Sequence, residues 1–212
     1  GACASPTPSA SWRYSVPEQP EAASGVTDKP GWAYARQAVA AANPLATDAG
    51  LQILRAGGSA LDAAIAVQMV LGLVEPQSSG IGGGAFLVHF DGQSVQAFDG
   101  GETAPAAATD KLFLDATGKP LAFFDAVVGG RSVGTPGLVR MLELAHQAHG
   151  KLPWAVLFEP AIRLAEDGFA VSPRLATLLR SDQYLFKDAT AATFFYPKGQ
   201  PLQAGAVLKN PA

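Results

Sequence analysis

The chain has 212 residues, of which 48% are hydrophobic and 16% are charged, and its formal net charge is −3. This apolar-rich composition excludes disorder over most of the chain, and the lack of a basic excess excludes a nucleic-acid-binding protein. The longest apolar stretch, residues 63–74, is interrupted by Gln68 and Gly72 and is short for a bilayer span. We therefore expect one globular domain or a piece of a larger one.

The N-terminal residues 1–32 are rich in Pro, Ser, Ala and Glu and lack apolar periodicity. This pattern predicts a tail or tether ahead of a domain over residues 33–212. The single cysteine, Cys3, cannot form an internal disulfide. Its setting, Gly-Ala-Cys followed by small and polar residues, resembles the end of a bacterial lipoprotein signal, although Gly1 and Ala2 are equally compatible with another signal remnant. We expect an exported, periplasmic protein, with Cys3 as a candidate for lipid attachment.

The first predicted elements are a small-residue strand over residues 37–42 and a helix that follows it. Thr47 or Asp48 can cap this helix, and the glycines at 57 and 58 end it. Ser59 begins a second helix with Asp62 three residues later, which is a variant of the capping box. This second helix is apolar almost all round, so we expect it to be buried on most faces, and a proline at 76 ends it.

The later elements are a hairpin and three helices. Residues 86–100 contain two short apolar segments around Asp91-Gly92, a dipeptide typical of a two-residue hairpin turn. A helix capped by Thr135 then runs to Gly150, with a proline in its first turn. Two more are predicted within residues 152–168 and after Ser172, and residues 184–212 favour turns. Helices, a hairpin and more helices predict an α+β arrangement.

The glycine run at residues 80–84 is the most unusual stretch of the sequence. Glycine is favoured where backbones approach closely or where φ is positive. A phosphate-binding loop would follow a strand and open a helix, whereas here a helix precedes and a strand follows, and no Lys-Ser or Lys-Thr pair closes the run. We therefore expect Gly82, Gly83 and Gly84 to be structural, at a close contact between the long helix and the hairpin.

Other candidates for chemistry are few. No Gly-x-Ser-x-Gly nucleophile turn is present. His146 and His149 are spaced to share a metal on one helix, but their polar neighbours favour a solvated face. His89 lies in a predicted strand and favours a structural role. Four carboxylates lie at element ends, where caps or ion pairs are the expected roles: Asp62, Glu75, Asp99 and Glu102. The residues alone therefore predict no catalytic set, no metal and no cofactor in this chain.

Several separate segments resemble one family. Residues 43–90, 100–113, 132–154 and 160–176 are similar, in collinear order, to the N-terminal part of the large subunit of the γ-glutamyltranspeptidases. The resemblance implies an N-terminal-nucleophile hydrolase fold, an αββα sandwich of which this chain is the front portion. It also implies a precursor that cleaves itself, so that the small subunit begins with a threonine nucleophile whose own α-amine is the base. That threonine lies outside these 212 residues, so the expected partner is the small subunit.

One position departs from the family pattern. Members of the family generally carry an arginine that grips the α-carboxylate of the γ-glutamyl group, and the matching residue here is Gly101, beside Glu102. Arg131 is a candidate to replace it, although a surface or ion-pairing arginine is the alternative. A changed acyl specificity and an engineered replacement also remain open.

The resemblance implies a γ-glutamyl transferase or hydrolase that acts on amides such as glutathione or glutamine, with an amino acid, peptide or water as acceptor. Two alternatives stay open. One is a related amidase or cephalosporin-type acylase, and the other is a scaffold protein without catalysis. A threonine at the start of a small subunit would separate the enzymes from the scaffold.

Overall fold

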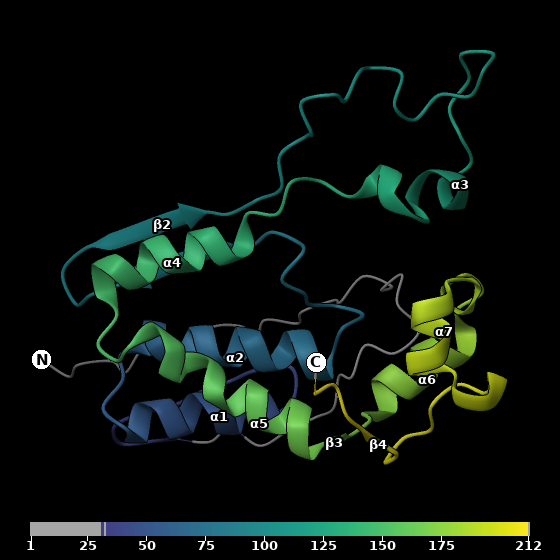
Figure 1. Cartoon of the computed structure of the whole chain (residues 1–212). Coiled ribbons are helices and arrows are strands. Elements are labelled where there is room, and N and C mark those ends of the chain that lie inside the picture. Colours follow the sequence, from purple (N-terminus) through teal and green to yellow (C-terminus); the bar gives the residue numbers. More distant parts are fainter. Residues whose placement is uncertain (1–30, 32, 212) are drawn as a thin grey trace, which may run out of the picture.

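The computed structural model describes residue 31 and residues 33–211. Cys3 and most of the predicted tail lie outside the described residues. Helices alternate with two short antiparallel ladders (Figure 1). The helices are α1 (Pro44–Arg55), α2 (Ala60–Val74), α3 (Phe123–Val127), α4 (Leu138–His149), α5 (Glu159–Asp167), α6 (Pro173–Ser181) and α7 (Ala189–Phe195). The strands are β1 (Phe86–Phe90), β2 (Val95–Asp99), β3 (Phe169–Ala170) and β4 (Val207–Leu208).

The first two helices form a closely packed pair. Helix α1 begins earlier than predicted, because the Asn43 side chain accepts a hydrogen bond from the Leu45 amide and Pro44 fits the first turn. The predicted caps at Thr47 and Asp48 are therefore wrong. The predicted strand over residues 37–42 is also wrong: that segment has no regular secondary structure and joins no ladder among the described residues.

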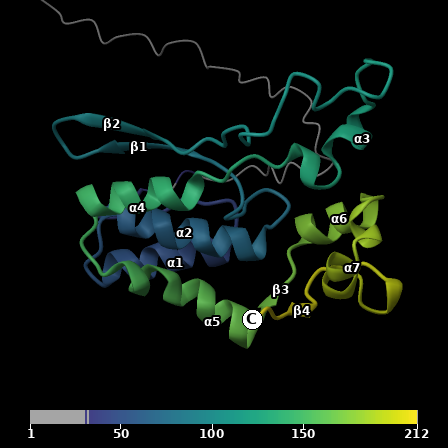
Figure 2. The same ribbon diagram turned by 45° about the horizontal axis from the view of Figure 1, so that its top comes forward.

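Helix α2 matches its prediction closely. Ser59 and Asp62 form the reciprocal capping box, and the helix ends at Val74. Most of its apolar residues are buried, because α1, α4 and α5 pack around it. Figure 2 shows the resulting order of layers, with α1 below α2, α4 above α2, and the hairpin above α4.

The predicted hairpin is confirmed, with Phe86 opposite Asp99 and Phe90 opposite Val95. Its turn lies one residue later than predicted, centred on Gly92 and the next residue, because the Asp91 amide donates to the Ser94 carbonyl. The Asp91 carboxylate accepts hydrogen bonds from the Gln93 amide and from the amide and hydroxyl of Ser94. These bonds hold the pKa of Asp91 at about 2, below its usual value.

One face of the hairpin is covered and the other is open. Leu87 and Phe98 pack against the cluster of buried residues beneath α4. The side chains of Phe86, Val88 and Phe90, which alternate with the covered ones, are 65–77% exposed. The described residues thus contain two two-stranded sheets, β1-β2 and β3-β4, and no larger sheet.

The predicted cap of α4 at Thr135 is wrong: the N-cap is Gly137, two residues later, and the helix begins at Leu138. Thr135 instead pairs with Thr103 in an antiparallel bridge, at 3.3 and 2.8 Å. This bridge closes the base of an extended arm, residues 104–134, which carries α3 and projects away from the helical layers (Figure 1). The ring of Phe124 in the arm stacks on Tyr184 at 4.8 Å.

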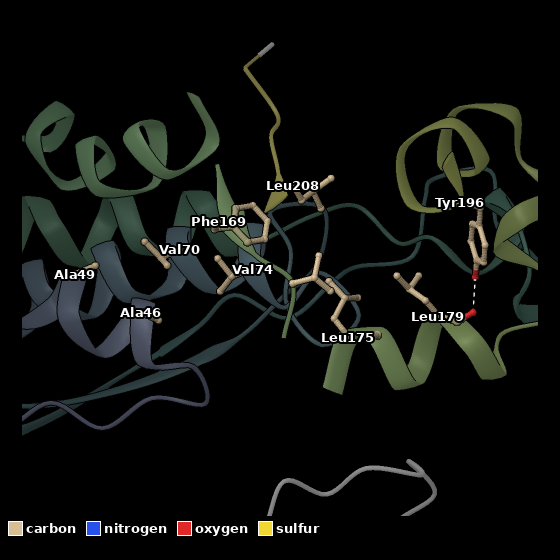
Figure 3. Packing of buried hydrophobic residues seen from close by; sticks show 11 residues of the cluster. Ala46, Ala49, Val70, Val74, Phe169, Leu175, Leu179, Tyr196 and Leu208 are labelled. Atoms are coloured by element: carbon tan, nitrogen blue, oxygen red, sulfur yellow. Dashed lines mark hydrogen bonds between the residues drawn. The ribbon is translucent and has the colours of Figure 1, made fainter. Parts of the chain in front are cut away.

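The C-terminal part forms a second cluster. Ser172 caps α6 as predicted, and Gly168, at φ 99°, ends α5. Residues 189–195 form a helix where turns were predicted, because Asp188 caps it. Figure 3 shows how the buried side chains run from α1 and α2 across β3 to α6 and Tyr196, whose hydroxyl donates to the Leu179 carbonyl at 2.9 Å.

Candidate functional site

The glycine run crosses two other segments of backbone. The Gly83 carbonyl accepts hydrogen bonds from the amides of Gly137 and Leu138, both at 3.2 Å. These amides open α4, so a carbonyl from a distant segment satisfies donors that a side-chain cap would otherwise satisfy. Ala85 and Gly100 exchange two backbone hydrogen bonds at 3.2 and 2.9 Å, which continues the hairpin ladder beyond its strands. We call this three-way contact the glycine crossing.

The glycine crossing leaves no room for side chains at several positions. A Cβ on Gly84 would lie 2.6 Å from the Gly100 carbonyl oxygen and 2.8 Å from the Gly101 Cα. A Cβ on Gly100 would lie 2.6 Å from the Met141 Cβ, and one on Gly137 would lie 2.5 Å from the Gly100 oxygen. Real Cβ atoms essentially never approach this closely. Glycine is therefore required at these positions by contact.

The other two glycines of the run are less constrained. A Cβ on Gly83 would lie 3.3 Å from the Glu102 Oε1, which is the far end of a flexible side chain. A Cβ on Gly82 would meet nothing within 4 Å. The close contact expected for all three residues is thus concentrated at Gly84.

The Glu102 side chain lies across the glycine crossing. Its Oε2 is 2.6 Å from the position that a Cβ on Gly84 would take, and its own Cβ is 2.8 Å from the corresponding position on Gly134. Glu102 therefore occupies space that these two glycines leave free. Glu102 also lines a hollow of about 540 Å³ beside the glycine run. The rest of the lining comes from Gln68, from Leu138 and from several residues within 76–85, including Ser78.

Gly101 differs from its glycine neighbours. It is not among the positive-φ glycines, and a Cβ there would lie 3.1 Å from the Asp99 Oδ1 and 3.7 Å from the Phe86 ring. The Asp99 carboxylate accepts the Gly101 amide hydrogen at 2.9 Å. The backbone at 101 therefore accepts a side chain with only a small shift of Asp99. The present residue leaves acidic groups on either side, at Asp99 and Glu102.

Arg131 lies in the arm and not in the hollow. It belongs to a short 3₁₀ turn, Gly130–Ser132, and its guanidinium donates to the Leu112 carbonyl at 2.9 Å. Both partners are arm residues, and Arg131 is exposed. Its side chain therefore braces the arm in this structure.

A buried network holds the segment that leads into the glycine run. The Glu75 carboxylate accepts hydrogen bonds from Asn43 at 2.7 Å, from Gln77 at 2.5 Å and from Ser172 at 3.2 Å. Asn43 and Ser172 are themselves the N-caps of α1 and α6, so Glu75 ties two helix starts to the end of α2. Farther along, Gln68 donates to the Ser79 hydroxyl at 2.6 Å. These bonds fix the entry to the run.

The remaining titratable candidates have structural partners. Asp62, fully buried, accepts from the amides of Lys151 and Leu152 at 3.0 and 3.1 Å, besides its capping bond. His146 donates to the Leu152 carbonyl at 2.8 Å. His149 stacks on His89 at 4.1 Å. The two helix histidines thus face different partners. Within residues 33–211, no group of three or more His, Cys, Asp or Glu side chains could hold a metal.

The glycine crossing was only partly visible in the sequence. The run at 80–84 was conspicuous, but its partners lie 16 to 54 positions away in the segments "DGG" at 99–101 and "GTPG" at 134–137. Glycines cluster in both partner segments, and that clustering is the signal that could have linked them. Nothing local to Glu102 predicted that its side chain would lie against Gly84 and Gly134.

Comparison with known proteins identifies the family. The family model for gamma-glutamyltranspeptidase matches residues 46–212. The glutathione hydrolase proenzyme of Bacillus subtilis (strain 168) is 41% identical over 172 residues, which are 80% of this chain and 29% of that protein. The glutathione hydrolase proenzyme of Escherichia coli (strain K12) is 36% identical, over 80% of this chain and 30% of that protein.

Solved structures agree with the sequence matches. The crystal structure of Helicobacter pylori gamma-glutamyltranspeptidase aligns with a TM-score of 0.80 and 33% identity, over 85% of this chain and 52% of that one. A cephalosporin acylase from Bacillus halodurans aligns with a TM-score of 0.68 and 29% identity, over 88% of this chain and 37% of that one.

The chain belongs to the gamma-glutamyltranspeptidase family. Its fold is therefore that of the N-terminal-nucleophile hydrolases, as the resemblance implied, and the described residues form a front portion of it. The chain spans less than a third of the curated relatives quoted above. In the described part of the chain, no helix has the length and apolar character needed to cross a membrane.

Proposed function

We propose that the complete protein is a γ-glutamyl hydrolase or transferase that acts on amides such as glutathione or glutamine. The observation that carries this proposal is the family match over residues 46–212, to relatives named as glutathione hydrolases. This chain contributes the glycine crossing and the hollow beside it. The hydrogen bonds of Glu75 hold the segment that leads into the crossing. The chemistry belongs to a threonine nucleophile on a small subunit outside these residues.

The proposed reaction is acyl transfer. The threonine hydroxyl attacks the γ-amide carbonyl, the α-amine of the same residue takes the hydroxyl proton, and the amine of the leaving group departs with a proton. Water or the amine of an acceptor then takes the acyl group from the threonine oxygen. In this scheme the present chain binds and orients the donor, and it supplies no group that forms or breaks a bond.

A second candidate function is acyl transfer from donors without an α-carboxylate. Two observations favour it: Gly101 supplies no cation where the family places one, and one solved relative is a cephalosporin acylase. Arg131 would have to leave its bond to the Leu112 carbonyl to act as a substitute. We also propose that the protein is exported and that Cys3 carries a lipid. The support is the sequence around Cys3, which resembles the end of a bacterial lipoprotein signal.

The test compares the complete protein with residues 1–212 expressed alone, using release of an aniline from a γ-glutamyl anilide. We expect turnover only for the complete protein, because the nucleophile lies outside the shorter chain. A butyryl anilide, which lacks both the α-ammonium and the α-carboxylate groups, measures the acylase alternative in parallel. Turnover by residues 1–212 alone would place a nucleophile in this chain and contradict the proposal. A complete protein inert toward both donors would leave the scaffold alternative.

A further inference from the structure

Glu75 is a buried carboxylate that the proposed reaction does not use directly. It follows the last turn of α2, and its side chain belongs to a residue that is 5% exposed. Its Oε1 accepts a hydrogen bond from the Asn43 amide group, and its Oε2 accepts bonds from the Gln77 amide group and the Ser172 hydroxyl. All three partners are donors, so this place needs an acceptor on both oxygens, which an ionised carboxylate provides and a carboxamide does not.

Two helix starts compensate the charge of this carboxylate. Asn43 is the N-cap of α1 and Ser172 is the N-cap of α6, so the positive ends of both helix dipoles lie beside Glu75. Neither of the ion pairs found within residues 33–211 includes Glu75. A buried carboxylate is costly unless hydrogen bonds and nearby positive charge offset the loss of water, and α1 and α6 supply both. Removing the negative charge therefore weakens the junction of three helix ends.

The same residue holds the turn that forms one wall of the hollow. The Glu75 carbonyl accepts hydrogen bonds from the amides of Ser78 and Ser79 at 3.0 and 3.1 Å, and its carboxylate holds the Gln77 side chain. This turn, over residues 76–79, provides most of the lining together with four glycines of the run. Glu75 thus connects the wall of the hollow to the starts of α1 and α6.

We propose that Glu75 is a positioning residue for the proposed acyl transfer, an inference that rests on that function. Its carboxylate holds the turn at residues 76–79 through Gln77, and the turn places the wall beside which the donor amide is oriented toward the threonine. A displacement of about 1 Å far from the reacting atoms can lower the rate roughly a hundredfold, because those atoms lose their alignment. Glu75 touches no reacting atom in this scheme, so its loss lowers the turnover of bound donor and changes donor binding little.

The test uses the complete protein with the change Glu75→Gln, which keeps the size of the side chain but leaves one oxygen for three donors. Gln77→Met is the second variant, because it removes the link from Glu75 to the turn and leaves the Asn43 and Ser172 bonds in place. The matched control is Glu166→Gln, because Glu166 is exposed on α5, away from the lining of the hollow. Kinetics are measured below the melting temperature of every variant, with each anilide that the complete protein turns over, so that a loss of stability alone leaves kcat unchanged.

We expect Glu75→Gln and Gln77→Met each to lower kcat about tenfold or more, with KM changed by less than about threefold. The double variant should lose no more than the worse single variant, because Glu75 acts on the turn through Gln77. An unchanged kcat in either single variant, a change confined to KM, or losses that multiply in the double variant would overturn the inference.

Hydrogen exchange over residues 76–85 gives a readout that does not depend on turnover. We expect Glu75→Gln to raise the exchange rates of the Ser78 and Ser79 amides, which donate to the Glu75 carbonyl, while Glu166→Gln leaves them unchanged. If the complete protein turns over neither anilide, the proposed function fails. Faster exchange in Glu75→Gln then still supports the role of Glu75 in holding the turn, and unchanged exchange overturns it.

Discussion

The tightest point of the glycine crossing makes a quantitative prediction, for which we choose Gly84→Ala in the complete protein. The added methyl group would lie 2.6 Å from the Gly100 oxygen and 2.8 Å from the Gly101 Cα, where ordinary contact begins at 3.4 Å. A third neighbour, the Glu102 Oε2 at 2.6 Å, is a side-chain end that can swing away. The two backbone atoms cannot, because Gly100 is held by its paired hydrogen bonds to Ala85.

The expected cost follows from what must move. Overpacking a close contact by one methyl group costs roughly 1–3 kcal/mol. Lengthening one of the two Ala85–Gly100 hydrogen bonds adds about 1 kcal/mol. We therefore expect the free energy of unfolding to fall by roughly 2–4 kcal/mol in total. The melting temperature of the complete protein should fall as well, by less for each kcal/mol than the roughly 2–4 °C typical of a domain of 150–250 residues.

The matched control is Gly82→Ala, two residues earlier in the same run. A Cβ on Gly82 meets nothing within 4 Å, and Gly82 is not among the positive-φ glycines. Alanine there should leave the stability unchanged or raise it by about 0.4–1 kcal/mol, because it restricts the unfolded chain. Thermal unfolding of the complete protein, followed by intrinsic fluorescence, measures both variants. Equal melting temperatures for Gly84→Ala and Gly82→Ala would refute the contact argument.

Two further predictions concern the Glu75 network and the residue at 101. Glu75→Ala should lower the free energy of unfolding by roughly 2–4 kcal/mol, because it leaves the buried Asn43 donor and the partly buried Ser172 donor without their acceptor, whereas Glu75→Gln should cost less; urea titration checks this, and equal costs would contradict it. Gly101→Arg should lower KM about tenfold for donors with an α-carboxylate and less for donors without one, because a bidentate contact contributes roughly 1.5–3 kcal/mol. If Arg131 already binds that carboxylate, Arg131→Ala should be the damaging change and Gly101→Arg should have little effect. Steady-state kinetics of both variants decide, and equal small changes for all donors would mean that neither residue contacts the carboxylate.

The elements that the sequence predicted well are those whose ends are determined locally. The start of α2 follows from Ser59 and Asp62, three residues apart, and the start of α6 from Ser172 followed by a proline. The hairpin follows from apolar segments on either side of a turn containing Gly92. In each case the donors and acceptors concerned lie within a few positions of one another, so a short window of sequence contains the whole cause.

The elements that were missed depend on distant partners. Helix α4 begins at Leu138 because the Gly83 carbonyl, more than fifty positions away, accepts its first amides, and Thr135 is drawn into a bridge with Thr103. The segment 37–42 resembled a strand, but a strand needs a neighbour, and none of the described residues pairs with it. For the same reason the position of Glu102 could not be predicted, since the space it fills is left by glycines of two other segments.

The contrast among the glycines separates positions where the fold requires glycine from one where a side chain fits. At Gly84, Gly100 and Gly137 a Cβ would strike backbone or buried atoms, so these residues are required by the fold and say nothing about substrate. Gly101 has no such requirement: φ is not positive, and only the side chains of Asp99 and Phe86 come near its Cβ position. Glycine at 101 is therefore not required by the backbone. Compared with the arginine of the family pattern, it removes one positive charge beside Asp99 and Glu102. Gly101→Arg would therefore add a cation between Asp99 and Glu102 without disturbing the glycine crossing.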